Sequence, residues 1–297
     1  MKRTTYTAFI AMSLGLAATS QAALTTNLLA YYDFEETGTN GLKNKAPGAT
    51  AYHGSWSGSF NGSDADGPGF TGNASYNPGD GLSDRSTLLV GNALNIVDGN
   101  NTFADMPIGS ADTGKTMTVS FWSYLAPGTG NGSARFHAFE TGDSGVYDLS
   151  VGTTSSYSST GRDDYAAYGP SNKQIGTSVA GFSEESWDHH VITTTLSGAN
   201  INTAYYLNGA PTRSDTDGVA ANFTFTGLHF GDGRAGSGER DWDGLIDEVA
   251  IWGRALTPTE VGELHTRGSN GLAVVPEPSS AALLGLGGLA LILHRRK

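Results

Sequence analysis

The sequence predicts an all-β domain, an antiparallel sandwich of two packed sheets with one short helix at its end. Three observations carry this prediction. Short stretches in which apolar and polar residues alternate recur along the chain. Residues that favour turns, among them 42 glycines, separate these stretches. No long stretch has the helical period, and about a dozen short strands joined by turns are typical of two packed sheets.

The N-terminal region, residues 1–23, has the three parts of a signal peptide: a basic start, an apolar run and an exit of small residues. We expect cleavage after Ala22, with Ala23 as the alternative. A retained membrane helix is disfavoured, because the apolar run is shorter than the ~20 residues that a spanning helix needs.

The C-terminal region contains a linker, residues 271–278, which includes Pro276, Glu277 and Pro278, and a final segment, residues 279–297, which is apolar and ends in cations. This pattern predicts a separate C-terminal membrane helix with its basic end on the cytoplasmic side. The apolar part reaches only ~22 Å as a helix, against a hydrocarbon core of ~30 Å, which suits a transient anchor.

The triplet, the apolar segment and the terminal Arg-Arg-Lys together resemble the PEP-CTERM sorting signal of Gram-negative bacteria. The resemblance implies that an exosortase, a membrane protease, recognises Pro276, Glu277 and Pro278, and that the protein is released or attached at the cell surface. A simple C-terminal anchor without processing stays open. In both cases we expect an exported protein of the cell envelope or extracellular space, anchored at the membrane before sorting.

The first half of the domain begins with a strand over residues 28–34, where the residues alternate between two faces. Residues 88–96 and 103–108 are predicted as a pair of short strands around a turn at residues 98–101. Residues 116–124 alternate again, and one face of this strand is predicted to be core.

The other face of that strand carries Trp122 and Tyr124 among hydroxyl residues, and it is either a binding face or a packed edge. Trp242 lies in a polar loop between two aspartates. Flat amphipathic rings of this kind stack on sugars. We therefore predict Trp122, Tyr124 and Trp242 as ligand-binding residues.

The second half of the domain continues with strands over residues 135–140, 146–151, 188–196, 204–207, 223–230 and 245–252. Asn208 and Gly209 predict a tight hairpin, because both residue types tolerate positive φ. Thr257, followed by Pro258 and by Glu260, predicts the capped start of a short helix.

These segments, in this order, resemble the laminin-G-like jellyroll family of the concanavalin A-like lectin and glucanase fold. The segments that carry the resemblance are residues 29–36, 91–96, 118–122, 187–191, 206–209, 244–252 and 254–261. The resemblance implies a jellyroll domain over residues 24–270, binding of a glycan or a protein partner, and general support for Ca²⁺.

Composition excludes several functions. The net charge of −12 argues against nucleic acid and anionic lipid, which both require a basic face. The chain has no cysteine, so thiol catalysis and cysteine-based metal sites are excluded.

Candidate metal ligands are carboxylates near the last strand. Asp247 alternates with Leu245, Val249 and Ile251 and is predicted to point inward, where a carboxylate must be paired, hydrogen-bonded or metal-bound. Asp241 and Asp243 belong to one of three Asp-x-Asp-Gly units, the others starting at Asp64 and Asp215. We predict Ca²⁺ at Asp241, Asp243 and Asp247, with a structural hydrogen bond and an ordinary turn as alternatives.

Catalysis is not expected. A glycosidase needs two facing carboxylates, and Asp247 and Glu248 are adjacent and should point to opposite faces of a strand. For the same reason, His189 and His190 are expected to point to opposite faces. We therefore expect an exported, non-enzymatic protein that binds a glycan or a surface protein. A polysaccharide hydrolase and a purely structural envelope protein are the alternatives.

Overall fold

The computed structural model describes residues 23–35, 42–57, 70–72, 92–96, 103–109, 115–125, 135–138, 149–153, 164–169, 173–174, 179–180, 186–219, 225, 227–230 and 244–275. In this part of the chain, sixteen strands and the helix α3 (Pro258–Ser269) form a sandwich of two antiparallel sheets. The predicted all-β class and the two-sheet architecture with one terminal helix are confirmed.

The first sheet, here called sheet A, contains eight strands. Their order is β14 (Ala210–Val219), β13 (Asn200–Leu207), β12 (Trp187–Ser197), β6 (Met117–Leu125), β16 (Gly244–Trp252), β4 (Asn92–Ile96) and β3 (Phe70–Gly72), with β1 (Leu28–Tyr32) also paired to β16. The predicted hairpin is confirmed, because Asn208 (φ +51°) and Gly209 (φ +76°) connect β13 to β14. The unit starting at Asp215 lies within β14 rather than in a turn.

The second sheet, sheet B, also contains eight strands. Their order is β10 (Lys173–Gln174), β9 (Asp164–Gly169), β8 (Leu149–Thr153), β7 (Arg135–Ala138), β15 (Gly227–Phe230), β5 (Phe103–Pro107) and β2 (Ser55–Ser57), with β11 (Val179–Ala180) also paired to β9. The predicted pairing of residues 88–96 with residues 103–108 is wrong, because β4 belongs to sheet A and β5 to sheet B.

The main core lies between the two sheets. Phe121, Ile192 and Ile251 enter it from sheet A, and Leu228 and Phe230 enter it from sheet B. Each is at most 4% exposed. Strands of both sheets therefore bury one face in the same core, as the alternating pattern predicts.

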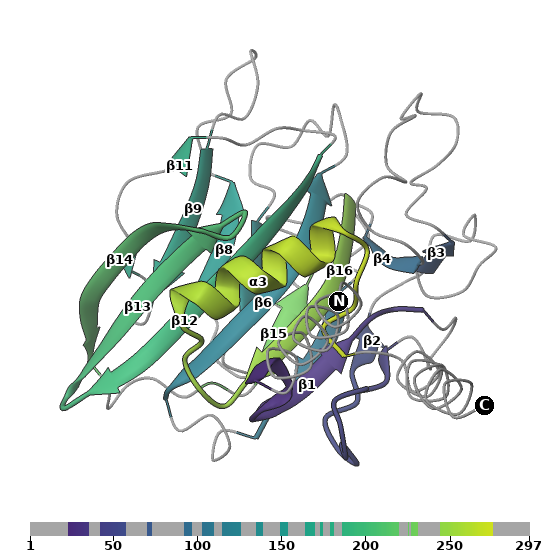
Figure 1. Cartoon of the computed structure of the whole chain (residues 1–297), viewed down its shortest axis with the longest axis horizontal. Helices are drawn as coiled ribbons and strands as arrows, with labels where there is room; N and C mark the ends of the chain where they lie inside the picture. The colour runs from purple at the N-terminus through teal and green to yellow at the C-terminus, as the bar shows by residue number, and fades with distance from the viewer. Residues whose placement is uncertain are drawn as a thin grey trace, which may run out of the picture.

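The other face of sheet A is covered by α3, which lies across the sheet in Figure 1. The helix begins at Thr257 with the predicted capping box, in which Glu260 also pairs with Arg254 at 2.7 Å. Val261 and Leu264 of α3 enter a second apolar cluster with Trp252 and Tyr206 of the sheet. Sheet A is consequently buried on both faces over much of its area.

The start of the described chain docks on the same side of sheet A. The indole Nε1 of Trp252 donates to the Leu24 carbonyl at 2.6 Å, and Arg254 Nη2 donates to the Ala23 carbonyl at 2.7 Å. Leu24 is fully buried. Residues directly after the predicted cleavage point at Ala22 are thus part of the folded domain.

Within the described ranges, no helix has the length and apolar character required to cross a bilayer. The predicted membrane helix at residues 279–297 lies outside those ranges, as do Ala22 and the triplet Pro276, Glu277 and Pro278.

Candidate functional site

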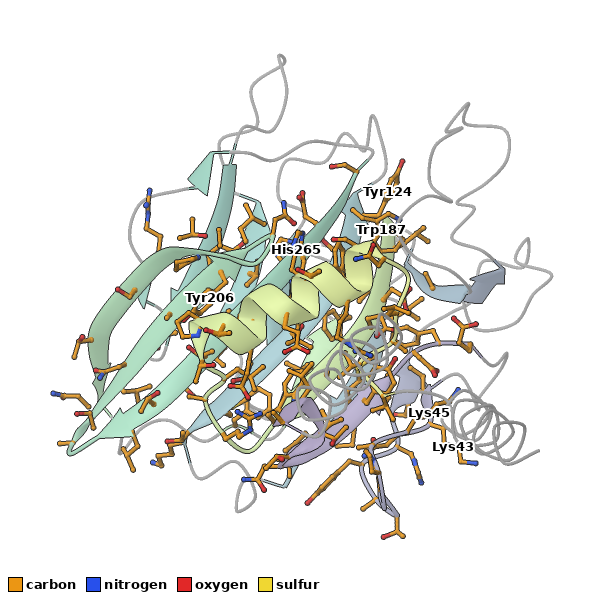
Figure 2. All side chains as sticks on the ribbon, in the orientation of Figure 1. Lys43, Lys45, Tyr124, Trp187, Tyr206 and His265 are labelled. Carbon is orange, nitrogen blue, oxygen red and sulfur yellow. The ribbon has the colours of Figure 1, made fainter. Side chains whose placement is uncertain are left out.

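The outer face of sheet A holds two of the predicted ligand-binding residues, Trp122 and Tyr124. Both are buried, with 3% and 1% of their surface exposed. The Trp122 ring stacks on His189 of β12 at 4.9 Å and on His265 of α3 at 5.5 Å between ring centroids. Tyr124 packs beside Trp187 at 5.7 Å, and Figure 2 shows this pair near the last turns of α3, with Tyr206 near its first.

Two glycines allow this tight packing of α3. A Cβ atom on Gly268 would lie 2.5 Å from Cζ2 of Trp122, so the helix backbone rests directly on the indole ring. A Cβ atom on Gly209 would lie 2.8 Å from the Cβ atom of His265. Trp122 and Tyr124 are therefore both packed, and a sugar could reach Trp122 only if α3 moved away. Their role in ligand binding stays a prediction.

His189 and His190 lie on opposite faces of β12, as predicted. His189 Nε2 hydrogen-bonds Ser120 Oγ at 2.8 Å on the outer face. His190 hydrogen-bonds Ser123 at 3.0 Å and the Tyr205 hydroxyl at 2.9 Å on the inner face.

Neither histidine is part of a catalytic triad in the described structure. Burial lowers the pKa of His190 to about 3. Burial, followed by the charges of His265 and His190, holds the pKa of His189 well below its usual range. His189 Nδ1 has no hydrogen-bond partner in the described part of the chain, so no carboxylate there orients its ring beside Ser120. A Ser-His-Asp triad requires that third group. The described contacts of the two histidines are hydrogen bonds to Ser120, Ser123 and Tyr205 and ring stacking within the sandwich.

The predicted orientation of Asp247 and Glu248 is wrong. Glu248 has φ +51°, and the pairing of β16 with β6 shifts between Asp247 and Ala250, so the two carboxylates occupy a β-bulge. Leu245 packs with Tyr124 on the outer face, whereas Val249 and Ile251 enter the core between the sheets. Asp247 is opposite Trp122 in the register and therefore shares the outer face.

Glu248 points to that outer face as well. Its two carboxylate oxygens accept from the Tyr31 hydroxyl at 2.7 and 2.8 Å, and Tyr31 belongs to the cluster under α3. Asp247 Oδ1 accepts from the Glu248 amide at 2.7 Å. The bulge thus places adjacent carboxylates on one face, which a regular strand cannot do.

Burial, together with the charges of neighbouring carboxylates, decides the protonation of this pair. Burial raises the pKa of Glu248 to about 7, although hydrogen bonds from Tyr31 and the Val274 amide oppose the shift. The pKa of Asp247 is also raised well above its usual value, first by burial and then by the charge of Glu248. Such a pair binds a proton readily or attracts a cation. Asp247 is 4% exposed, which leaves it inaccessible to a polysaccharide.

The predicted calcium site is only partly described. Asp241, Trp242 and Asp243 lie outside the described residues. Inside them, no group of three or more histidine, aspartate or glutamate side chains could hold a metal ion. Hydrogen bonds already occupy both oxygens of Glu248. Asp247 alone cannot supply the six to eight oxygens that Ca²⁺ requires, so the calcium site stays a prediction that depends on Asp241 and Asp243.

Sheet B carries a feature that sequence reasoning missed. The strand register places seven polar residues in one row across seven strands: Ser55, Asp105, His229, His137, Ser150, Tyr168 and Gln174. Directly paired residues share a face of the sheet. Leu228 and Phe230 flank His229 in β15 and enter the core, so the row belongs to the outer face. His229, the third position of the row, is 6% exposed.

The row crosses strands that are far apart in sequence, so no local pattern shows it. Alternation within each strand could have indicated which positions face away from the core. In β8, for example, Leu149 and Val151 enter the core and Ser150 lies between them in sequence. Only the strand order brings these separate polar positions into one row.

Comparison with known families decides the identity of the fold. The profile of the concanavalin A-like lectin/glucanases superfamily matches residues 98–262, more than half of the 297 residues. The chain belongs to this superfamily. The profile of the PEP-CTERM protein-sorting motif matches residues 274–297 of this concanavalin A-like chain, which confirms the predicted sorting signal.

No curated protein matches the chain, but solved structures share its fold. Domain 4 of AbnA, a GH43 extracellular arabinanase from Geobacillus stearothermophilus in complex with arabinotriose, is similar at 19% identity and a TM-score of 0.50, covering 80% of this chain and 98% of that domain. The binding domain of Paraclostridial Mosquitocidal Protein 1 has 13% identity and a TM-score of 0.51, covering 82% of this chain and 52% of that one.

A third structure is a Trypanosoma rangeli sialidase mutant with trans-sialidase activity, at 13% identity and a TM-score of 0.55. The match covers 84% of this concanavalin A-like chain but 34% of the sialidase chain. The chain therefore spans about a third of that protein and about half of the mosquitocidal binding domain. At these identities the likeness establishes the fold alone.

Proposed function

We propose that this protein is an exported binding protein of the cell envelope or extracellular space that takes a glycan on the outer face of sheet B. The polar row from Ser55 to Gln174 is the observation that carries the proposal. Hydroxyl, amide and imidazole groups exchange hydrogen bonds with sugar hydroxyls, and a tyrosine adds a flat ring. The sorting motif supports export and an exosortase-type partner.

Sheet A is the weaker candidate for the ligand. Trp122 lies beneath α3, and Tyr124 is buried beside Trp187. Opening this face at Trp122 would separate the helix from its aromatic stack. A protein partner in place of a glycan would be recognised through the same outer face of sheet B, and the glycan titration below distinguishes the two.

Binding without turnover is the function we propose, because the row contains one carboxylate, Asp105. Glycoside hydrolysis requires two carboxyl groups about 5–5.5 Å apart for retention or about 6.5–9.5 Å apart for inversion. The bulge pair, Asp247 and Glu248, lies beneath α3 and the residues that follow it. A hydrolase and a purely structural protein are the alternative functions, and the test below distinguishes them from glycan binding.

The test titrates the purified full chain, in mild detergent, with arabino-oligosaccharides and then with a broad glycan array. The first probe is suggested by the arabinotriose bound to the similar arabinanase domain. We expect one class of glycan to bind, and Tyr168→Ala to weaken it at least tenfold through lost stacking, worth about 1.4 kcal/mol. Thr195→Ala, an exposed change on β12 of sheet A, is the matched control.

Each outcome of the glycan test has a meaning. Equal affinity in Tyr168→Ala and Thr195→Ala would remove the row as the binding surface. Release of reducing ends would favour the hydrolase. No glycan bound and none cleaved would favour a protein partner or a structural role.

We also propose that Ca²⁺ binds at Asp247 with Asp241 and Asp243. A divalent cation would neutralise a carboxylate whose pKa is raised first by burial and then by the charge of Glu248. We expect Ca²⁺ to raise the Tm of the wild type relative to EDTA, and Asp247→Ala to abolish this response. A wild type whose Tm is the same in both reagents would remove calcium from this site.

A further inference from the structure

The chain after α3 does not leave the domain at the end of the helix. Gly271 has φ +65°, and its amide donates to the Gly268 carbonyl at 2.8 Å, which reverses the chain direction. The Leu272 amide donates to the Arg267 carbonyl at 3.0 Å, and Arg267 Nη2 donates to the Ala273 carbonyl at 2.7 Å. These bonds hold residues 271–275, here called the strap, against the helix end.

Val274 anchors the strap in the domain. Its side chain is 6% exposed and belongs to the apolar cluster beneath α3. Its amide donates to Glu248 Oε2 at 3.2 Å, and the Tyr31 hydroxyl holds the same carboxylate at 2.8 Å. The neighbouring residues Ala273 and Val275 pack partly against the cluster. Leu272, by contrast, is 54% exposed.

The strap reaches into the sorting signal. The matched motif begins at residue 274, so its first two residues are packed on the domain, and Pro276 follows directly. An enzyme that acts on a peptide bond binds several residues of extended chain, which is why folded and docked segments resist cleavage. The residues available upstream of the triplet are those of the strap.

We propose that the strap must detach from the domain before the sorting motif is processed, so that the docking of Val274 beside Glu248 limits the rate of processing. The processing enzyme would then bind residues 271–275 in extended form, in competition with the folded domain. This inference rests on the proposed processing by an exosortase-type enzyme and is independent of the glycan proposal.

Two variants of the strap form a matched pair. Val274→Ser removes a buried side chain, whereas Leu272→Ser makes the same kind of change at an exposed position two residues away. We expect Val274→Ser to raise hydrogen exchange at the strap amides about tenfold and to speed processing by up to that factor. Leu272→Ser should alter neither rate.

Hydrogen exchange is measured by mass spectrometry on the purified full chain in detergent. Processing is followed by pulse-chase in an exporting bacterium that possesses an exosortase, with loss of the C-terminal tail read as a mass change. Tyr31→Phe is the second variant, because it removes the hydroxyl that holds Glu248 and keeps the buried ring. It should also raise the rates of hydrogen exchange at the strap and of tail removal. The test therefore stays informative if Val274→Ser destabilises the whole domain.

The proposal is overturned if exchange at the strap rises and processing does not. It is also overturned if the strap exchanges as fast in the wild type as in Val274→Ser, since docking would then be absent in solution. A tail removed at the same rate from the wild type and all variants would overturn this inference alone, whereas a tail retained by all of them would overturn the proposed processing and this inference with it.

Discussion

The two outer faces of this sandwich are built from the same kind of strand but carry opposite chemistry. On sheet A, one cross-strand row runs through Trp187, Tyr124 and Leu245, and all three are at most 5% exposed. On sheet B, the corresponding row is polar at every position. The helix α3 covers the apolar face of sheet A, whereas the polar row of sheet B marks the face that we propose for a ligand.

We expect the largest loss of stability from a substitution that displaces α3 from sheet A. Such a change would expose the apolar face and remove the contrast between the two faces. Gly268→Ala places a methyl group 2.5 Å from the Trp122 ring. Overpacking of a buried contact costs about 1–3 kcal/mol, and we expect the upper end because the buried indole also stacks on His189 and His265, which leaves it little room to move. Urea unfolding would measure the loss.

Gly262→Ala is the control for that experiment. The nearest atom to its added methyl group is 3.9 Å away, so the change meets no obstacle. It should stabilise the helix by up to about 1 kcal/mol, because alanine is the better helix former. Equal destabilisation by both substitutions would mean that α3 does not rest on Trp122.

The second prediction concerns the carboxylates that the sealed face buries. The pKa of Glu248 rises from 4.5 to about 7 on folding. Its contribution to stability is therefore fully present below pH 4.5 and is lost as the pH rises through about 7. We expect the wild type to lose stability between pH 5 and pH 8, and Glu248→Gln to lose less.

The buried His190 on β12 makes the free energy of unfolding change with pH in the opposite direction. The pKa of His190 falls from 6.5 to about 3, so its contribution is present above pH 6.5 and declines as the pH falls toward 3. Unfolding free energies at pH 4, 5, 6.5 and 8 separate the two effects. An identical change from pH 5 to pH 8 in the wild type and Glu248→Gln would contradict the assignment to Glu248.

The smallest expected effect lies at the start of α3, where the cover of sheet A begins. Thr257→Ala removes the N-cap hydroxyl that accepts from the Glu260 amide. A lost cap costs about 1 kcal/mol, which thermal unfolding would detect as a lower Tm. Thr266→Ala, an exposed change in the same helix, should stay within about 0.5 kcal/mol. Similar shifts for both would show that the cap contributes little.

Local patterns in the sequence predicted the parts of the fold that local physics determines. The Asn208-Gly209 turn and the Thr257 capping box depend on a few neighbouring residues, and both are confirmed. Alternation also separated Phe121 from Trp122 on the two faces of β6. It could not tell that a helix more than 130 residues later covers Trp122.

The candidate site was harder to predict because it depends on strand order and on one irregular residue. A regular strand would have sent Asp247 and Glu248 to opposite faces, and the left-handed φ of Glu248 reverses that outcome. Nothing in the side chain of glutamate signals a bulge. The assignment of β4 and β5 to different sheets is likewise a tertiary choice, and the row on sheet B depends on it.

The exit point of the chain determines how the molecule is presented. The strap leaves the domain beside Glu248 on the outer face of sheet A, and the polar row lies on the far side of the inter-sheet core. A molecule attached by its C-terminal end would therefore have sheet A on the side of the attachment. The face of sheet B that we propose for a ligand would then point away from the point of attachment.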